Sequence, residues 1–91
     1  MESDEAAQAL FEALRDFRRE IARAEQVPAY RIAWDRTLQE VAQRRPRNQD
    51  ELLQIWGIGP QTAERYGAGL LGVVARAPPS LRGKQERPAS D

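Results

Sequence analysis

Proline and glycine divide this chain into short segments, and that division constrains its fold more than any other feature of the sequence. Pro28 and Pro46 each end a helical segment, because proline disfavours helical geometry in the residue before it. A Gly-Ile-Gly-Pro turn occupies residues 57–60, and a double proline at residues 78–79 closes the last apolar segment. The segments between these breaks predict an all-α fold, a compact bundle of about five short helices with no strand.

Helical periodicity is clearest in the first segment, which predicts a helix over residues 6–25. Its apolar residues follow one another at spacings of four, three and four, and they are Leu10, Leu14, Phe17 and Ile21. This spacing places them in a single stripe along the helix. The arginines of the segment fall beside the stripe, so we expect most of them to lie on a solvated face. Residues 28–32 predict a short irregular or 3₁₀ segment.

Capping residues indicate where the next two helices begin. Thr37 with Glu40, and Asn48 with Glu51, both fit the capping-box pattern. In that pattern the side chain of the first residue accepts a hydrogen bond from a backbone amide of the first helical turn. We therefore predict a second helix that starts at Thr37 and ends at residues 44–45, and a third that starts at Asn48.

The turn at residues 57–60 separates the third helix from the fourth. We expect Trp56 on the apolar face of the third helix, which Gly57 closes in the left-handed conformation that only glycine adopts cheaply. Ile58 should turn inward. Gly59 and Pro60 fit the N-cap and the first position of the next helix.

The remaining apolar residues predict a fourth and a fifth helix separated by Gly67. They cover residues 61–66 and 68–77. The chain has 91 residues, which is enough for one small domain. We expect a lead-in, a helical domain and a disordered tail or linker, at residues 1–5, 6–77 and 78–91.

The chain contains no cysteine and no histidine. The absence of cysteine excludes a disulfide framework and a thiolate metal site, and the absence of histidine excludes a serine–histidine–aspartate triad and His-ligated zinc. No loop has the acidic spacing of a calcium site, and no apolar run approaches the roughly 20 residues of a membrane span. We therefore expect a non-catalytic binding domain with no metal, no cofactor and no membrane contact.

Acidic and basic residues balance overall, with 14 of each, but they are unevenly distributed. Residues 1–14 hold four acids and no base, whereas residues 15–47 hold nine arginines against five acids. Arginine suits forked contacts to phosphate and stacking on flat rings. High-GC codon usage explains the same composition equally well. A neutral total argues against strong non-specific binding to a polyanion, so any basic surface is local.

Two segments carry candidate binding chemistry. The turn with Gly57 and Gly59 can point the amide groups of a helix N-terminus at a phosphate, or it can serve only to bring two helices close together. In residues 27–36, two aromatic residues alternate with two arginines. Rings that stack on bases beside arginines that meet phosphates suit single-stranded nucleic acid. We expect Tyr30 to be the exposed ring, Trp34 to be partly buried, and Ile32 to lie in the core.

Five sequence blocks in this order resemble the HRDC domain, the helicase-and-RNase-D C-terminal domain of RecQ-type DNA helicases and RNase D. The blocks are Val27-Pro28-Ala29-Tyr30, Thr37-Leu38-x-Glu40, Pro46, Glu51-Leu52-Leu53-x-Ile55-x-Gly57-Ile58-Gly59, and Tyr66-Gly67. The resemblance covers roughly residues 6–77, and the arginine-rich composition is most similar to a RecQ domain from a high-GC bacterium. It implies a five-helix bundle without catalytic residues, attached to an ATP-dependent DNA helicase in the cytoplasm, at the nucleoid.

The resemblance also implies a weak contact to single-stranded or branched DNA that modulates substrate binding by the helicase. Tyr30 matches a tyrosine on the family's DNA-binding surface, and Arg31 and Arg36 lie beside it in the sequence. With Arg19 and Arg23 from the first helix, these are the predicted DNA-binding residues. The alternative is a protein-interaction module that docks on the helicase core, on a second copy of the domain or on a repair protein.

Overall fold

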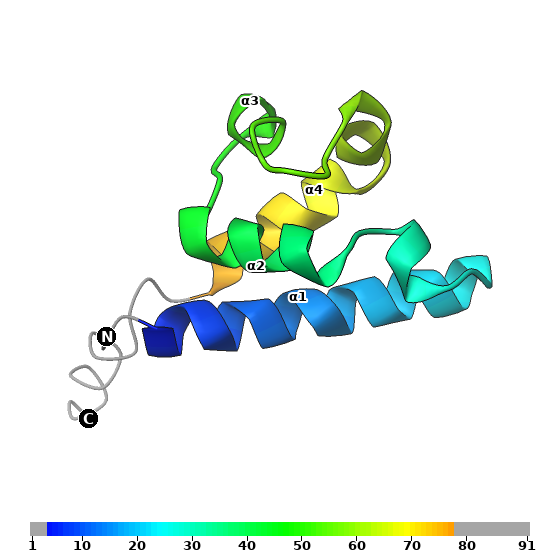
Figure 1. Ribbon diagram of the computed structural model, residues 1–91, viewed down its shortest axis with the longest axis horizontal. Helices are drawn as coiled ribbons and strands as arrows, with labels where there is room; N and C mark the ends of the chain where they lie inside the picture. The colour runs from blue at the N-terminus through cyan, green and yellow to red at the C-terminus, as the bar shows by residue number, and fades with distance from the viewer. Residues whose placement is uncertain (1–3, 78–91) are drawn as a thin grey trace.

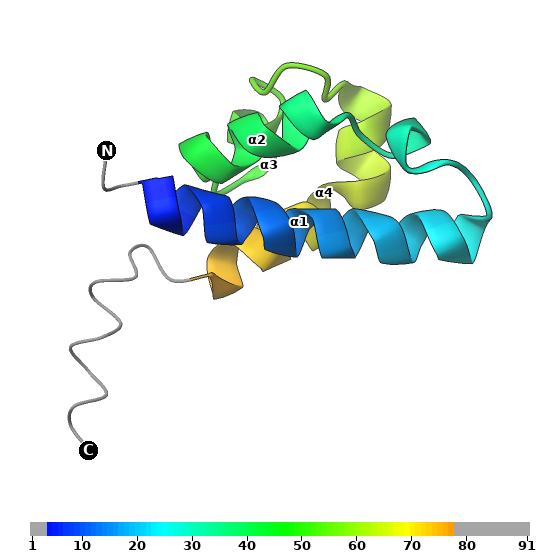
Figure 2. The ribbon, with the colours of Figure 1, turned by 60° about the horizontal axis from the view of Figure 1, so that its bottom comes forward.

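The longest helix, α1, forms the base on which the other helices pack. The computed structural model describes residues 4–77, and α1 spans Asp4–Glu25. The chain then passes through a 3₁₀ turn, η1 (Ala29–Arg31), and reverses direction into α2 (Asp35–Arg44). Helices α1 and α2 lie side by side and antiparallel in both ribbon views (Figures 1 and 2). The short helix α3 (Gln49–Leu52) leads to α4 (Pro60–Arg76), which descends from α3 to the N-terminal half of α1.

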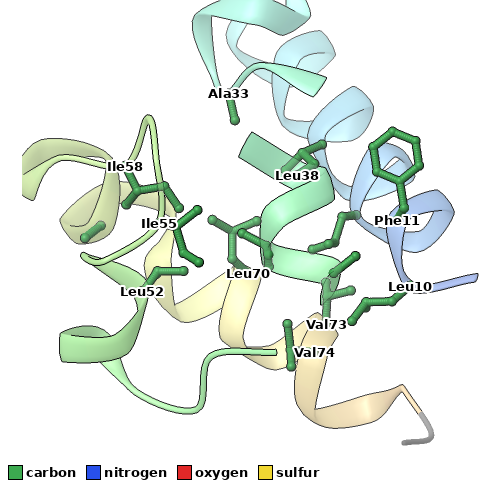
Figure 3. Packing of buried hydrophobic residues seen from close by; sticks show 14 residues of the cluster. Leu10, Phe11, Ala33, Leu38, Leu52, Ile55, Ile58, Leu70, Val73 and Val74 are labelled. Atoms are coloured by element: carbon green, nitrogen blue, oxygen red, sulfur yellow. The ribbon is translucent and has the colours of Figure 1, made fainter. Parts of the chain in front are cut away.

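All four helices contribute side chains to one core. Leu10 and Leu14 of α1, Leu38 of α2, Leu52 of α3 and Leu70 of α4 are each at most 2% exposed. Figure 3 shows Leu52, Ile55 and Ile58 facing Leu70, while Val73 and Val74 lie near Leu10. Ile58 is therefore buried, as the sequence predicted. The apolar stripe of α1 faces the core, and α2 and α4 pack against this helix.

The number of helices differs from the prediction at Gly67. In place of a fourth and a fifth helix the structure has one continuous α4, so the described residues hold four α-helices and one 3₁₀ turn. The glycines of α4 are points of close approach rather than breaks. A side chain on Gly67 would meet Gln49 of α3, and one on Gly69 would meet the ring of Phe17 of α1.

The start of α2 also differs from the prediction. The helix begins at Asp35 with Trp34 at the N-cap position, and no side chain caps it there. Thr37 is therefore not the cap but a fully buried residue of the first turn. It faces the turn before α4, where Gly57 packs against its hydroxyl group. The expected cap at Asn48 is confirmed, because its Oδ1 accepts a hydrogen bond from the backbone amide of Glu51 at 2.9 Å.

The end of α2 is fastened to the end of α4. Arg45 follows the last residue of α2 in the left-handed conformation, with φ of 49°. Its guanidinium donates hydrogen bonds to the carbonyl oxygens of Ala77, at 3.0 Å, and Val74, at 3.4 Å. These bonds satisfy carbonyl groups that a helix C-terminus leaves without a partner. The predicted tail, residues 78–91, and most of the predicted lead-in, residues 1–5, lie outside the described residues; α1 starts two residues before the predicted position.

Candidate nucleic-acid interface

Two exposed aromatic rings stack on each other between α1 and α2. Tyr30 lies on η1 and Trp34 immediately precedes α2; their ring centroids are 5.7 Å apart and their planes are 26° from parallel. Ile32 and Ala33, which lie between Tyr30 and Trp34 in the sequence, are buried, whereas the two aromatic residues are exposed. Tyr30 is 56% exposed, as predicted, but Trp34 is 55% exposed rather than partly buried. Trp34 thus stacks on Tyr30 and does not pack into the core.

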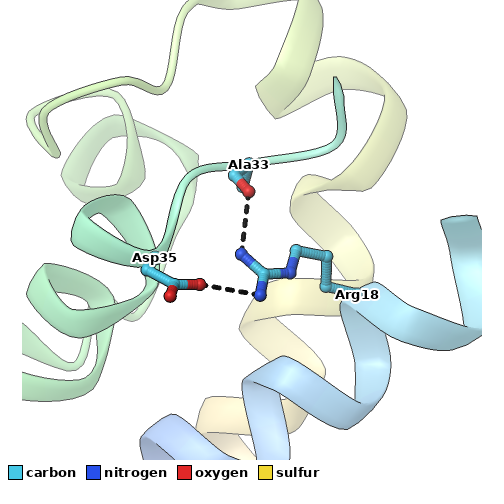
Figure 4. A network of polar contacts seen from close by, with 3 residues as sticks. All are labelled: Arg18, Ala33 and Asp35. Atoms are coloured by element: carbon cyan, nitrogen blue, oxygen red, sulfur yellow. Dashed lines mark hydrogen bonds and ion pairs between the residues drawn. The ribbon is translucent and has the colours of Figure 1, made fainter. Parts of the chain in front are cut away.

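A buried arginine holds the segment that carries these rings. Arg18 of α1 is only 9% exposed. Its Nη1 donates a hydrogen bond to the carbonyl oxygen of Ala33 at 2.9 Å, and its Nη2 pairs with Oδ1 of Asp35 at 2.7 Å (Figure 4). Together with Ala29, the side chains of Arg18 and Asp35 line a shallow pocket beneath Tyr30 and Trp34. The carboxylate of Asp35 is thus paired with a guanidinium, although its side chain stays 66% exposed.

The expectation of a solvated arginine face on α1 is wrong for Arg18. The sequence does contain a signal for its burial. Arg18 continues a row of residues four apart, and the other members of that row, Leu10, Leu14 and Ala22, are all buried. A charged residue within such a row lies on the core side of a helix and requires a buried partner.

A third exposed ring, that of Trp56, lies in the connection between α3 and α4. It is 45% exposed, so it does not lie on a buried apolar face as the sequence suggested. The guanidinium carbon of Arg36, in the first turn of α2, is 4.3 Å from the centroid of this ring, a cation–π contact. The sequence indicated Arg36 as a binding residue but not Trp56. Trp56 lies among apolar residues, and no local pattern shows that its side chain faces the solvent.

The other predicted arginines differ in their surroundings. Arg31 ends η1 and is exposed. Arg19 pairs with Asp16 on α1 at 3.2 Å, and Arg23 is exposed in the last turn of α1. In the part of the chain that the structure describes, no hydrogen bond, ion pair or cation–π contact joins Arg19 or Arg23 to the ring pair. Within the described residues Arg31 likewise makes no such contact with the ring pair, and Arg36 contacts Trp56 instead. Arg31 and Arg36 are therefore neighbours of Tyr30 and Trp34 only by their place in the same segment, residues 30–36.

The turn at residues 57–60 has the predicted backbone conformation, but Gly57 does not close the third helix as expected. Helix α3 ends at Leu52, and residues 53–56 form turns in which the amides of Gln54 and Ile55 bond to carbonyl groups three residues earlier. Gly57 has φ of 87°, and Gly59 is the N-cap of α4 with Pro60 at the first position. A proline at this position removes one amide donor from the helix N-terminus. The contact of Gly57 with Thr37 supports the packing role of this turn, and phosphate binding by Gly57 and Gly59 stays a prediction.

Two kinds of site are absent from residues 4–77. No group of three or more acidic, histidine or cysteine side chains could hold a metal ion within this range. Over the same residues, none of the helices combines the length and the apolar character that a membrane crossing requires.

Comparison with known proteins places this arrangement in a family. Residues 7–74 match the HRDC domain. The chain is a member of the HRDC domain family. Among solved structures, the D. radiodurans RecQ HRDC domain 3 aligns with a TM-score of 0.73 and 34% sequence identity, over 75% of this chain and 90% of that one. The four-helix arrangement described above is thus an HRDC fold.

Curated relatives of this HRDC domain are DNA helicases. ATP-dependent DNA helicase RecQ of Bacillus subtilis (strain 168) is 47% identical over 58 residues, which are 64% of this chain and 10% of the helicase. RecQ of Haemophilus influenzae is 42% identical over 65 residues, 71% of this chain and 10% of that helicase. ATP-dependent DNA helicase UvrD2 of Mycobacterium tuberculosis is 36% identical over 61 residues, 67% of this chain and 9% of that helicase.

The chain thus spans about a tenth of the length of the RecQ helicases that it matches. In RecQ helicases the HRDC domain is an auxiliary, non-catalytic domain, and this chain is a domain of that kind.

Proposed function

We propose that this HRDC domain contacts single-stranded or branched DNA weakly and thereby modulates how an attached RecQ-type helicase binds its substrate in the bacterial cytoplasm. The observation that carries the proposal is the stacked pair of Tyr30 and Trp34, each of which is more than half exposed, in a segment that also contains Arg31 and Arg36. Exposed rings of this size cost free energy in water. A base that stacks on them removes this apolar surface from the solvent.

The chemistry of the site favours a weak contact. Each base that stacks on an aromatic ring contributes about 1–3 kcal/mol, and the flanking guanidinium groups of Arg31 and Arg36 are suited to the phosphates. The chain carries no net charge, with 14 basic and 14 acidic residues, so it lacks a broad field that attracts DNA. As part of a helicase, such a contact would act through tethering, because a linked module raises the local concentration of its site at the DNA.

A titration of a fluorescently labelled single strand, followed by anisotropy, tests the proposal. Tyr30→Ala is expected to reduce the affinity roughly fivefold or more, whereas Tyr30→Phe, which keeps the ring, should bind like the wild type. Two phosphate contacts predict a loss of roughly sevenfold in affinity between about 50 and 200 mM salt. Undetectable binding, or an unchanged affinity in Tyr30→Ala, would contradict the proposal.

A groove between the ends of α2 and α4 favours a second candidate function, docking on a protein. Its walls combine arginine side chains with an apolar floor that includes Pro46, Leu71 and Val74. Balanced charges segregated along the chain suit docking between complementary surfaces. The partner in this case is the helicase core, another HRDC copy or a repair protein. Concentration-dependent sedimentation of a chain that does not bind DNA would favour this function over the first.

A further inference from the structure

Trp56 is an exposed aromatic residue that does not belong to the buried core. Its neighbours Ile55 and Ile58 are 3% and 5% exposed and belong to the core, whereas the Trp56 ring is 45% exposed. The turn that carries it is fixed by Gly57, which has a positive φ, and by the inward-facing Ile58. A single exposed apolar residue is common on protein surfaces, so the role of Trp56 depends on what lies beside it.

The residues around Trp56 connect it to the Tyr30–Trp34 pair. Arg36 lies over the Trp56 ring at 4.3 Å, and it is two residues after Trp34 in the first turn of α2. The next residue, Thr37, packs against Gly57, which directly follows Trp56. Trp34 directly precedes α2 and Arg36 lies in its first turn, so both exposed aromatic positions adjoin the start of α2.

We infer that Trp56 and Arg36 form a second base-stacking position, and that the ligand of this surface is an unpaired DNA strand that occupies both positions at once. This inference rests on the proposed function, in which the Tyr30–Trp34 pair is the first position. A base that stacks on the exposed part of the Trp56 ring has the guanidinium of Arg36 beside it for the adjacent phosphate.

The proposed ligand follows from the geometry of nucleic acids. In a duplex the bases stack on one another and are paired, so two separate aromatic positions cannot both reach a base face without unstacking the helix. A single strand can present successive bases to separate rings. Binding at the second position becomes intramolecular once the first is occupied, so the affinity rises with the length of the strand until both positions are filled.

A length series of labelled oligothymidines, from about four to about sixteen nucleotides, covers the usual site sizes of single-strand-binding folds. We expect Trp56→Ala to bind the shortest oligomer like the wild type and to lose roughly fivefold or more in affinity for oligomers that span both positions. Leu53→Ala is the matched control, because Leu53 is also an exposed apolar residue near the α3–α4 connection, 40% exposed, but has no ring on which a base can stack. It should bind every length like the wild type.

Tryptophan fluorescence provides a second measurement that does not depend on deleting the ring. The chain has two tryptophans, so Trp34→Phe leaves Trp56 as the sole indole fluorophore and keeps a ring to stack on Tyr30. Long oligomers should quench the emission of Trp56 in this variant, and the shortest should quench it much less.

The outcomes separate this inference from the proposed function. If Trp56→Ala binds all lengths like the wild type, or the emission of Trp56 stays constant while anisotropy reports binding, the second position is refuted. The first position still stands in that case, provided that Tyr30→Ala weakens binding. If the wild type binds no oligomer, or Tyr30→Ala binds as well as the wild type, the proposed function and this inference both fail.

Discussion

Arg18 links the packing of the domain to its exposed rings. Its guanidinium is buried between α1 and the segment before α2, where it bonds to the carbonyl oxygen of Ala33 and to Asp35. Its Nε has no hydrogen-bond partner within the described residues. A buried guanidinium that is only partly hydrogen-bonded contributes little net stability. The main role of Arg18 is therefore to position Trp34 and Asp35.

Replacement of Arg18 by alanine should destabilise the domain by about 1–3 kcal/mol, because the buried carbonyl of Ala33 loses its donor. The ion pair adds little to this loss, since the side chain of Asp35 is 66% exposed and water screens it. Arg19→Ala is the control. Its pair with Asp16 is exposed on both sides, so the change in the free energy of unfolding should stay within about 0.5 kcal/mol. Urea unfolding measures the free energy of unfolding of both variants. Equal losses of stability in the two would contradict the structural role of Arg18.

The exposure or burial of some residues at this surface could be predicted from their residue type, and that of others could not. The exposure of Tyr30 followed from its hydroxyl group, which tolerates water, and the burial of Ile32 followed from its aliphatic side chain. The exposure of Trp34 did not, because it depends on a stacking partner that only the 3₁₀ geometry of η1 supplies. The direction of Trp56 depends on the positive φ of Gly57 and on a contact with α2. Such contacts between distant segments leave no local pattern.

At the scale of helices, α4 shows why a glycine-rich segment was mistaken for a break. Glycine lowers helix propensity by about 1 kcal/mol relative to alanine, and this cost predicted an interruption at Gly67. In the structure the cost is offset by packing, since glycine at positions 67 and 69 lets α3 and α1 approach α4 closely. The helix boundaries set by proline and by Asn48, in contrast, followed from local chemistry that tertiary contacts did not override.

Two alanine substitutions in α4 should have opposite effects on stability. Gly72 has open space around it apart from the end of the Arg76 side chain, so Gly72→Ala should stabilise the domain by about 0.5–1 kcal/mol through helix propensity. Gly69→Ala places a methyl group against the ring of Phe17 and should destabilise it by about 1–3 kcal/mol. Thermal unfolding of both variants checks the prediction. Stabilisation by Gly69→Ala would show that α1 and α4 are not in close contact there.

The contact between the end of α1 and α4 predicts a pH dependence. The hydroxyl of Tyr66 donates a hydrogen bond to Oε1 of Glu25 at 2.8 Å. Burial and this hydrogen bond raise the pKa of Tyr66 above its ordinary value of 10.0, while the nearby charge of Arg65 acts in the opposite direction. The folded protein therefore holds the phenolic proton more tightly than the unfolded chain does. This contribution to stability is complete below pH 10 and is lost as the pH rises above that value.

Tyr66→Phe removes this contribution. At neutral pH the variant should be less stable than the wild type by no more than about 1 kcal/mol. The difference should shrink above about pH 10, because only the wild type loses stability as its phenol ionises. Urea unfolding at a series of pH values measures the difference. A gap that widens at alkaline pH would contradict the sign of the pKa shift.

At the scale of the whole molecule, ion pairs disperse the charge that the sequence concentrates. The arginine-rich stretch suggested a local basic surface, but Arg18, Arg19 and Arg44 each pair with a carboxylate at 2.7–3.3 Å. The all-α class and the family were predictable, because they depend on helix periodicity, helix breakers and ordered sequence blocks. The electrostatic surface was not, because it depends on which charges meet after folding.

The central claim is that an unpaired strand contacts the ring pair at the start of α2. An NMR titration of the ¹⁵N-labelled chain with an oligothymidine tests it most directly, because every backbone amide and both indole N–H groups report separately. The account predicts that the largest shifts occur in the amides of Ala29–Asp35 and in the indole signal of Trp34. If these signals stay in place while those around the groove at Arg45 and Val74 move, or if no signal moves, the account is wrong.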